Sequence, residues 1–151
     1  MVLEYITQYK DPIMFTDVLN YIMSRPIGPN DWVMFDIDDT LIKIDGTPMN
    51  EIIRLLKVCE MLDYKILILT ARPGNPDNKQ WTRQQLAQYG ITYDLLAFAP
   101  PEHKTTCKQH LMKERGYKFI LSVGDLPTDW TDSERYINTS IACCSLGKLQ
   151  K

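Results

Sequence analysis

Acidic residues follow two apolar runs of the chain at a spacing that suits nucleophilic and acid–base chemistry. Asp36 and Asp38 are two residues apart at the end of the run that begins at Trp32. On a continuing strand their side chains would share a face, so one carboxylate can attack an electrophile while the other exchanges a proton with the leaving oxygen. Asp125, at the end of a later apolar run, would complete an oxygen-rich site suited to Mg²⁺.

A hydroxyl group and an ammonium group follow two other predicted strands. Thr70 ends the run that begins at Lys65, and Lys104 lies beyond a third strand at the start of a helical stretch. Both side chains would donate hydrogen bonds to the oxygens of a transferring phosphoryl group. An isolated Asp-x-Asp pair is more typical of a solvated loop or a helix cap, but agreement between several strand ends favours a site.

The elements that must position these residues alternate between short apolar runs and amphipathic stretches. Asp11 and Pro12 are typical of a helix start, Asn50 is expected to cap a second helix, and Gly116 is expected just past the end of another. Helices are predicted from Pro12 up to the break at Arg25-Pro26, after Asn50 with Ile52, Ile53, Leu56 and Cys59 on the inner face, over 77–89 and over 102–115. Strands are predicted over 32–37, 65–70, 95–98 and 118–123 and within 137–144. This alternation predicts an α/β domain with a mostly parallel sheet covered by helices on both faces.

Composition excludes several classes of protein without selecting one. The 151 residues suit a single domain, 1–151, in which 1–30 would form a helical extension packed on the core, and the formal charge of -2 gives no basic stripe for nucleic acid. The sequence shows neither a run of 18 apolar residues nor a signal peptide, so a cytoplasmic protein is expected. The four cysteines form no CxxC pair and are expected to be reduced and mostly buried: Cys59, Cys107, Cys143 and Cys144.

Four ordered motifs of this chain resemble those of the haloacid dehalogenase superfamily of phosphotransferases. They span Trp32 to Trp130, about two thirds of the chain. The motifs are Phe35-Asp36-Ile37-Asp38-Asp39-Thr40-Leu41, Ile66-Leu67-Ile68-Leu69-Thr70, Lys104, and Val123-Gly124-Asp125-Leu126-Pro127-Thr128-Asp129. Finer features, such as Thr70-Ala71-Arg72-Pro73, resemble the acid-phosphatase-like branch. The resemblance implies a three-layer α/β/α Rossmann-like fold with a five-stranded sheet in the order 5-4-1-2-3.

The resemblance also implies a role for each site residue in phosphomonoester hydrolysis. Asp36 would be the nucleophile that forms an aspartyl-phosphate, and Asp38 the general acid and then the base. Thr70 and Lys104 would hold the phosphoryl oxygens, with Lys104 also steadying Asp36. An acid at position 38 favours phosphoryl transfer over dehalogenation, because the dehalogenating relatives lack that proton donor.

A magnesium site is implied by the same motifs. Its ligands would be a carboxylate oxygen of Asp36, the backbone carbonyl of Asp38, and Asp125. Asp129 would support the water shell of the metal or Lys104.

The substrate is a phosphorylated molecule whose identity the sequence leaves open. The gaps between Asp38 and Thr70 and between Thr70 and Lys104 are too short for a cap domain, so a bulky substrate would fit. Polynucleotide ends and phosphoproteins are therefore alternatives, although the net charge does not favour nucleic acid. A further alternative is a catalytically weak, phosphate-binding regulatory module of the same fold.

The sequence does not decide the roles of two basic residues. Arg72 could bind a second anionic group of the substrate or be a plain loop charge, and Lys108 competes with Lys104 as the phosphate-binding lysine, with Lys113 a weaker rival. Other residues are expected outside the chemistry: Asp39 pointing away from the metal, and His103 and His110 on the surface. Trp81 and Tyr89 are expected in packing rather than as a base-stacking platform, and Trp130 covering the core rather than lining the mouth of the site.

Overall fold

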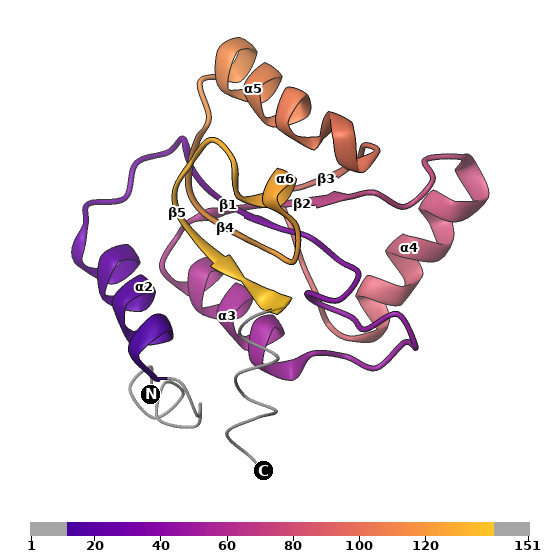
Figure 1. Cartoon of the computed structure of the whole chain (residues 1–151), viewed down its shortest axis with the longest axis horizontal. Helices are drawn as coiled ribbons and strands as arrows, with labels where there is room; N and C mark the ends of the chain where they lie inside the picture. Colours follow the sequence, from indigo (N-terminus) through magenta and orange to yellow (C-terminus); the bar gives the residue numbers. More distant parts are fainter. Residues whose placement is uncertain (1–11, 141–151) are drawn as a thin grey trace.

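A five-stranded sheet lies between two layers of helices in the computed structural model, which describes residues 12–140 (Figure 1). The fold class expected from the sequence is confirmed. In chain order the elements are α2 (Pro12–Ser24), β1 (Asp31–Phe35), α3 (Asn50–Met61), β2 (Lys65–Thr70), α4 (Pro76–Gln88), β3 (Leu95–Phe98), the 3₁₀ turn η1 (Pro101–His103), α5 (Lys104–Arg115), β4 (Lys118–Gly124), α6 (Pro127–Trp130) and β5 (Ser133–Asn138).

All neighbouring strands of the sheet are parallel, in the order β3-β2-β1-β4-β5. This is the expected order 5-4-1-2-3 read from the other edge. The chain proceeds from β1 through β2 to β3 at one edge, and then crosses back past β1 to form β4 and β5. The direction of winding therefore reverses between β1 and β4, which is where open α/β sheets bind their ligands, at the carboxyl ends of the strands.

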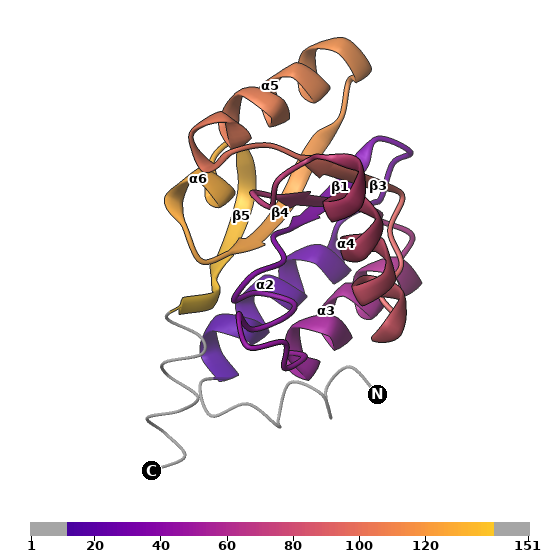
Figure 2. The same ribbon diagram turned by 90° about the vertical axis from the view of Figure 1, so that its right-hand side faces the viewer.

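The winding also decides which helices cover each face of the sheet. Right-handed crossovers from β1 to β2 and from β2 to β3 place α3 and α4 on one face. The crossover from β3 to β4 runs in the opposite direction, so α5 lies on the other face. Figure 2 shows α5 on one side of the sheet, with α2 and α3 on the opposite side.

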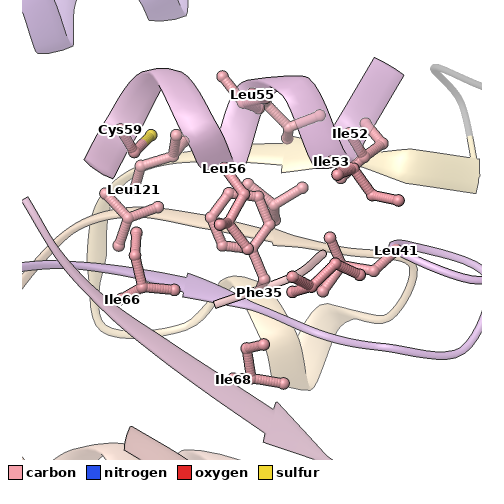
Figure 3. Close-up of a cluster of buried hydrophobic side chains, with 14 of the residues drawn as sticks. Phe35, Leu41, Ile52, Ile53, Leu55, Leu56, Cys59, Ile66, Ile68 and Leu121 are labelled. Atoms are coloured by element: carbon pink, nitrogen blue, oxygen red, sulfur yellow. The ribbon is translucent and has the colours of Figure 1, made fainter. Parts of the chain in front are cut away.

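The hydrophobic core has one cluster on each face of the sheet because β1 is buried on both. Val33 and Phe35 point into the larger cluster, and Trp32 and Met34 point into the smaller one. Figure 3 shows the larger cluster, in which Phe35 lies among side chains of α3 and the neighbouring strands. Each fully buried large apolar side chain contributes about 1.5–3 kcal/mol, so the two-sided burial explains why residues 32–35 of β1 are all apolar.

The helix α2 packs its apolar side chains into the larger cluster. Val18, Leu19 and Ile22 are buried there together with α3 and the strands. The predicted N-cap Asp11 and the side chain of Phe15 lie outside the described residues.

Several predicted boundaries differ from those of the structure, and two of the differences have a clear physical reason. The fifth strand covers Ser133–Asn138 rather than lying within 137–144, because an edge strand exposes residues such as Glu134 and Arg135 and so lacks the apolar run on which the prediction depended. The N-cap of α3 is Met49, and Asn50 is the first helical residue, with no side-chain cap hydrogen bond.

Two of the four cysteines lie in the part of the chain that the structure describes, and both are free thiols. Cys59, on α3, is buried and Cys107 is partly buried, while Cys143 and Cys144 lie outside the described residues. Between 12 and 140, none of the helices has the length and apolar character needed to cross a membrane.

Candidate active site

The end of β1 places two carboxylates at the point where the winding reverses. The strand ends at Phe35, and the backbone N–H of Asp36 donates to the carbonyl of Val123 on β4 at 3.0 Å. The chain then turns, with three backbone N–H groups converging on the carbonyl of Ile37. Asp36 is consequently buried between strands, whereas the side chain of Asp38 stays 41% exposed.

A buried lysine joins two of the carboxylates. The Nζ of Lys104, the first residue of α5, lies 2.8 Å from Oδ1 of Asp36 and 2.6 Å from Oδ1 of Asp129. Lys104 is buried, and a charged group is buried at reasonable cost only when it is paired in this way. Burial opposes the charge on Lys104, but the two carboxylates outweigh it and raise the pKa of the ammonium group.

Asp129 is held by the short helix α6 as well as by Lys104. Its Oδ2 accepts a hydrogen bond from the backbone N–H of Leu126 at 3.1 Å, which caps the helix start. Both carboxylate oxygens of Asp129 are therefore fixed before any ligand binds.

Three carboxylates form a cluster with the geometry of a cation site. One oxygen each from Asp36, Asp125 and Asp129 lies within 4.8 Å of the other two. Burial, together with the charge on Asp129, raises the pKa of Asp36 well above its usual range even though Lys104 acts in the opposite direction. Three carboxylates against one ammonium group leave excess negative charge, and carboxylate oxygens are the ligands that Mg²⁺ prefers. The residues present thus fit a hard divalent cation.

The carboxylate of Asp38 is bound by Arg72 rather than by Lys104. Nε of Arg72 lies 3.1 Å from Oδ2 of Asp38, and Nη2 lies 2.9 Å from Oδ1, which is a two-pronged ion pair. Nη1 of Arg72 donates to the hydroxyl of Thr82 on α4 at 3.3 Å, and the guanidinium lies 4.9 Å from the ring centroid of Trp81. Arg72 is therefore more than a loop charge, because it fixes the orientation of the Asp38 carboxylate.

Thr70 ends β2 at the same edge of the sheet and is buried. Its hydroxyl oxygen accepts a hydrogen bond from the backbone N–H of Arg72 at 3.2 Å, and its carbonyl accepts one from Ala99 at 2.9 Å. These contacts fix the turn that carries Arg72. A role of the Thr70 hydroxyl in binding phosphate stays a prediction.

Lys108 lies one turn further along α5 and faces the backbone of the α6 segment. Its Nζ donates to the hydroxyl of Ser122 at 3.1 Å and to the carbonyl of Asp129 at 2.9 Å, and it also contacts the carbonyl of Thr131. Burial lowers the pKa of Lys108 to about 8. The contact to Asp36 comes from Lys104, so the geometry favours Lys104 of the two lysines. Lys113 is exposed.

The remaining expectations are met except for one. The carboxylate of Asp39 accepts from the backbone N–H of Ile44 and stands outside the acidic cluster. Exposed positions for His103 and His110 and packing roles for Tyr89 and Trp130 agree with the structure. Trp81 was expected to pack, but it is 52% exposed, because the buried side chains of α4 are Thr82 and Leu86 and Trp81 lies beside that line.

Two pockets open beside these residues, and Lys43 lines both. One pocket of about 250 Å³ includes Asp125, and the other, of about 390 Å³, includes Asp38 and Arg72. Lys43 belongs to a short flap between β1 and α3, which turns at Asp45 and Gly46. Lys43 was not predicted to be a site residue, because a single lysine in a loop forms no recognisable sequence motif.

Comparison with known proteins supports the fold. No family model and no curated protein matches the chain. Among solved structures, the class C acid phosphatase from Bacillus anthracis is similar, with a TM-score of 0.61 and 15% identity over 85% of this chain and 64% of that one. A chain of the Pnkp1/Rnl/Hen1 complex is similar with a TM-score of 0.53 and 21% identity over 64% of this chain and 38% of that one. The chain thus spans less than two thirds of either structure's chain.

Proposed function

We propose that the chain is a Mg²⁺-dependent phosphomonoester hydrolase of the haloacid dehalogenase superfamily, which acts through an aspartyl-phosphate. One observation carries the proposal: the ammonium group of Lys104 lies between Asp36 and Asp129 at the point of reversed winding, beside a third carboxylate. The similarity of the fold to that of an acid phosphatase agrees with it. Three carboxylates are gathered there at a cost that a bound cation would offset.

In the first step, a carboxylate oxygen of Asp36 attacks the phosphorus of the substrate. The bond from phosphorus to the ester oxygen breaks, and Asp38, in its protonated form with one contact to Arg72 given up, donates that proton to the departing alkoxide. Lys104, and Thr70 as a further donor, hold the phosphoryl oxygens on which negative charge is spread. Arg72 holds the Asp38 carboxylate in place.

In the second step, Asp38 takes a proton from a water molecule as that water attacks the phosphorus. The bond between phosphorus and the Asp36 oxygen breaks, inorganic phosphate leaves, and the carboxylate of Asp36 is restored. Asp38 thus acts as a general acid in the first step and as a general base in the second.

Asp36, the backbone carbonyl of Asp38 and Asp125 would hold the magnesium ion, with Asp129 beside them or joined through water. The ion supplies positive charge that lowers the repulsion between the phosphate and the attacking carboxylate. Lys104 provides the permanent positive charge of the site.

The site is proposed to be open, without a cap domain. The segment between β1 and β2 contains a short flap and α3, and the segment between β2 and β3 contains α4. A site without a lid admits a phosphate attached to a bulky group. The substrate would therefore be selected by the surface around Asp38 and Arg72.

The test is turnover of an aryl phosphate by the full chain with and without Mg²⁺. Asp36→Asn keeps the shape of the side chain but removes the nucleophile, so we expect loss of turnover with an unchanged circular dichroism spectrum. Asp63→Asn, in the turn after α3, is the matched control and should keep full activity. Full activity of Asp36→Asn would overturn the proposal. If wild-type protein binds phosphate but hydrolyses no phosphoester in a broad panel, a binding module is the better assignment.

A further inference from the structure

An exposed tryptophan lies directly beside the proposed catalytic groups. Trp81 is 52% exposed, and its ring lies against the guanidinium of Arg72, which in turn holds Asp38. Ile44, on the flap, is 79% exposed and lines the same pocket. Exposing two large apolar side chains at one pocket costs free energy, and such patches mark binding sites.

The pocket extends away from the catalytic groups along α4. Trp81 and Gln85 line both the pocket of about 390 Å³ that contains Asp38 and Arg72 and a second one of about 190 Å³. The second pocket is completed by Gln84 and Gln88. A molecule whose phosphate lies at Asp36 could therefore place the rest of its structure along this helix.

The lining of the second pocket has a regular helical spacing. Trp81, Gln84, Gln85 and Gln88 follow the i, i+3, i+4, i+7 pattern, so they share one face of α4. None of the four is charged. In the described part of the chain, the buried amide oxygen of Gln85 has no hydrogen-bond partner, which is an unusual and costly arrangement for a native protein.

We propose that this face of α4, here called the α4 groove (Asn78, Trp81, Gln84, Gln85 and Gln88), binds the base of a nucleotide phosphomonoester. The inference rests on the proposed function and names its substrate class. An aromatic platform beside neutral amides matches a nucleobase, which offers a flat ring for stacking and an edge of donors and acceptors for amide groups. The ring would stack on Trp81, and the exposed amides of Gln84 and Gln88 would hydrogen-bond with the edge of the base.

The charges around the groove agree with this orientation. Lys43 and Arg72 lie at the end near Asp38, where the phosphate and the sugar would be, and the far end is neutral. A phosphorylated peptide segment would gain little from three glutamines around a flat ring. The nucleobase is therefore the occupant that the groove favours.

The first experiment compares kcat/KM for adenosine 5′-monophosphate and for glycerol phosphate, which has no base. Base stacking on an aromatic side chain is worth about 5- to 100-fold in affinity. For Trp81→Ala we expect the loss with the nucleotide to exceed the loss with glycerol phosphate by that factor, and for Trp81→Phe by much less. Gln88→Ala should reduce the preference for the nucleotide, whereas Gln80→Ala, on the same helix but in neither pocket, should keep it.

The second experiment measures binding without turnover. In Asp36→Asn protein, adenosine 5′-monophosphate should quench tryptophan fluorescence saturably, and Trp81→Phe added to that variant should abolish the quenching, although Trp32 and Trp130 remain. Equal losses for both substrates in the first experiment, quenching that persists without Trp81, or an equal Trp81→Ala effect on a phosphotyrosine peptide would overturn the inference. Hydrolysis of glycerol phosphate without any selectivity from Trp81 would leave the proposed function standing. If quenching depends on Trp81 but the protein hydrolyses no phosphoester, the proposed function is wrong and nucleotide binding in the α4 groove still stands.

Discussion

The carboxyl group of Asp129 occupies the space that a β-carbon on residue 124 would need. A β-carbon built on Gly124 would lie 2.4 Å from both Cβ and Oδ2 of Asp129, far inside van der Waals contact. Glycine at the end of β4 therefore allows Asp129 to approach the strand closely enough to meet Lys104. The Gly-Asp pair in the last motif is thus a packing requirement as well as a source of the carboxylate of Asp125.

Gly124→Ala should lower turnover of an aryl phosphate about 100-fold, because displacing Asp129 also displaces Lys104, and misplacement by about 1 Å can cost that much. The added methyl group should also cost about 1–3 kcal/mol of stability. Urea denaturation and steady-state kinetics measure the two effects. Gly28→Ala is the control, since a β-carbon there would lie 3.7 Å from Asp31, which is ordinary contact. Equal activity of the two variants would contradict this account of Gly124.

The two buried lysines of α5 should respond differently to replacement by methionine, which keeps the length but removes the charge. Lys104→Met should abolish turnover, because the proposed nucleophile loses the ammonium group 2.8 Å away, and it should also destabilise the fold, because the buried carboxylate of Asp129 loses its partner. Lys108→Met should destabilise the fold by about 2–4 kcal/mol, since the carbonyl oxygens of Asp129 and Thr131 lose their buried donor. Circular dichroism melts and kinetics on both proteins separate the two outcomes. A stable, fully active Lys104→Met protein together with an inactive Lys108→Met protein would reverse the assignment.

Most of the fold was predictable because buried strands carry their own signal. The buried central parts of β1, β2 and β4 are mostly apolar, since each strand is covered on both faces, and β3 was placed at its observed bounds. The edge strand β5 was predicted too far along the chain, because Glu134 and Arg135 face solvent and do not extend an apolar run. The start of α3 was misplaced by one residue because Asn50 is a common cap residue, yet here it makes no cap hydrogen bond.

The candidate site was only partly predictable, for a reason that Arg72 illustrates. Strand ends brought Asp36, Asp125 and Lys104 to one edge by topology alone, and the structure places these residues together. The turn after Phe35 decides whether a carboxylate pairs with Lys104 or with Arg72. The regular alternation of side chains along a strand does not describe that turn. The exposure of Trp81 likewise depends on the angle at which α4 packs, which a helical period does not give.

Arg72→Ala should lower kcat/KM about 100-fold, because Asp38 loses the two-pronged contact that orients it for proton transfer. Arg72→Lys should recover little of this loss, since an ammonium group cannot make two parallel hydrogen bonds to one carboxylate. Steady-state kinetics with an aryl phosphate gives the measurement. Arg83→Ala, at an exposed position of α4, is the matched control. Full recovery by lysine would mean that charge alone matters at position 72.

Magnesium should stabilise the protein whether or not it turns over substrate. Binding to the folded state at ten times the dissociation constant contributes about 1.4 kcal/mol, which for a chain of this size raises the melting temperature by about 3 °C. Asp125→Asn should abolish that shift, because it removes one of the three carboxylates of the cluster. Without magnesium, the same variant should be at least as stable as the wild type, since it relieves repulsion with the buried carboxylate of Asp36. Asp132→Asn, an exposed carboxylate outside the cluster, should keep the shift. A magnesium shift that survives in Asp125→Asn would place the cation elsewhere, and the acidic cluster would then lose its assigned role.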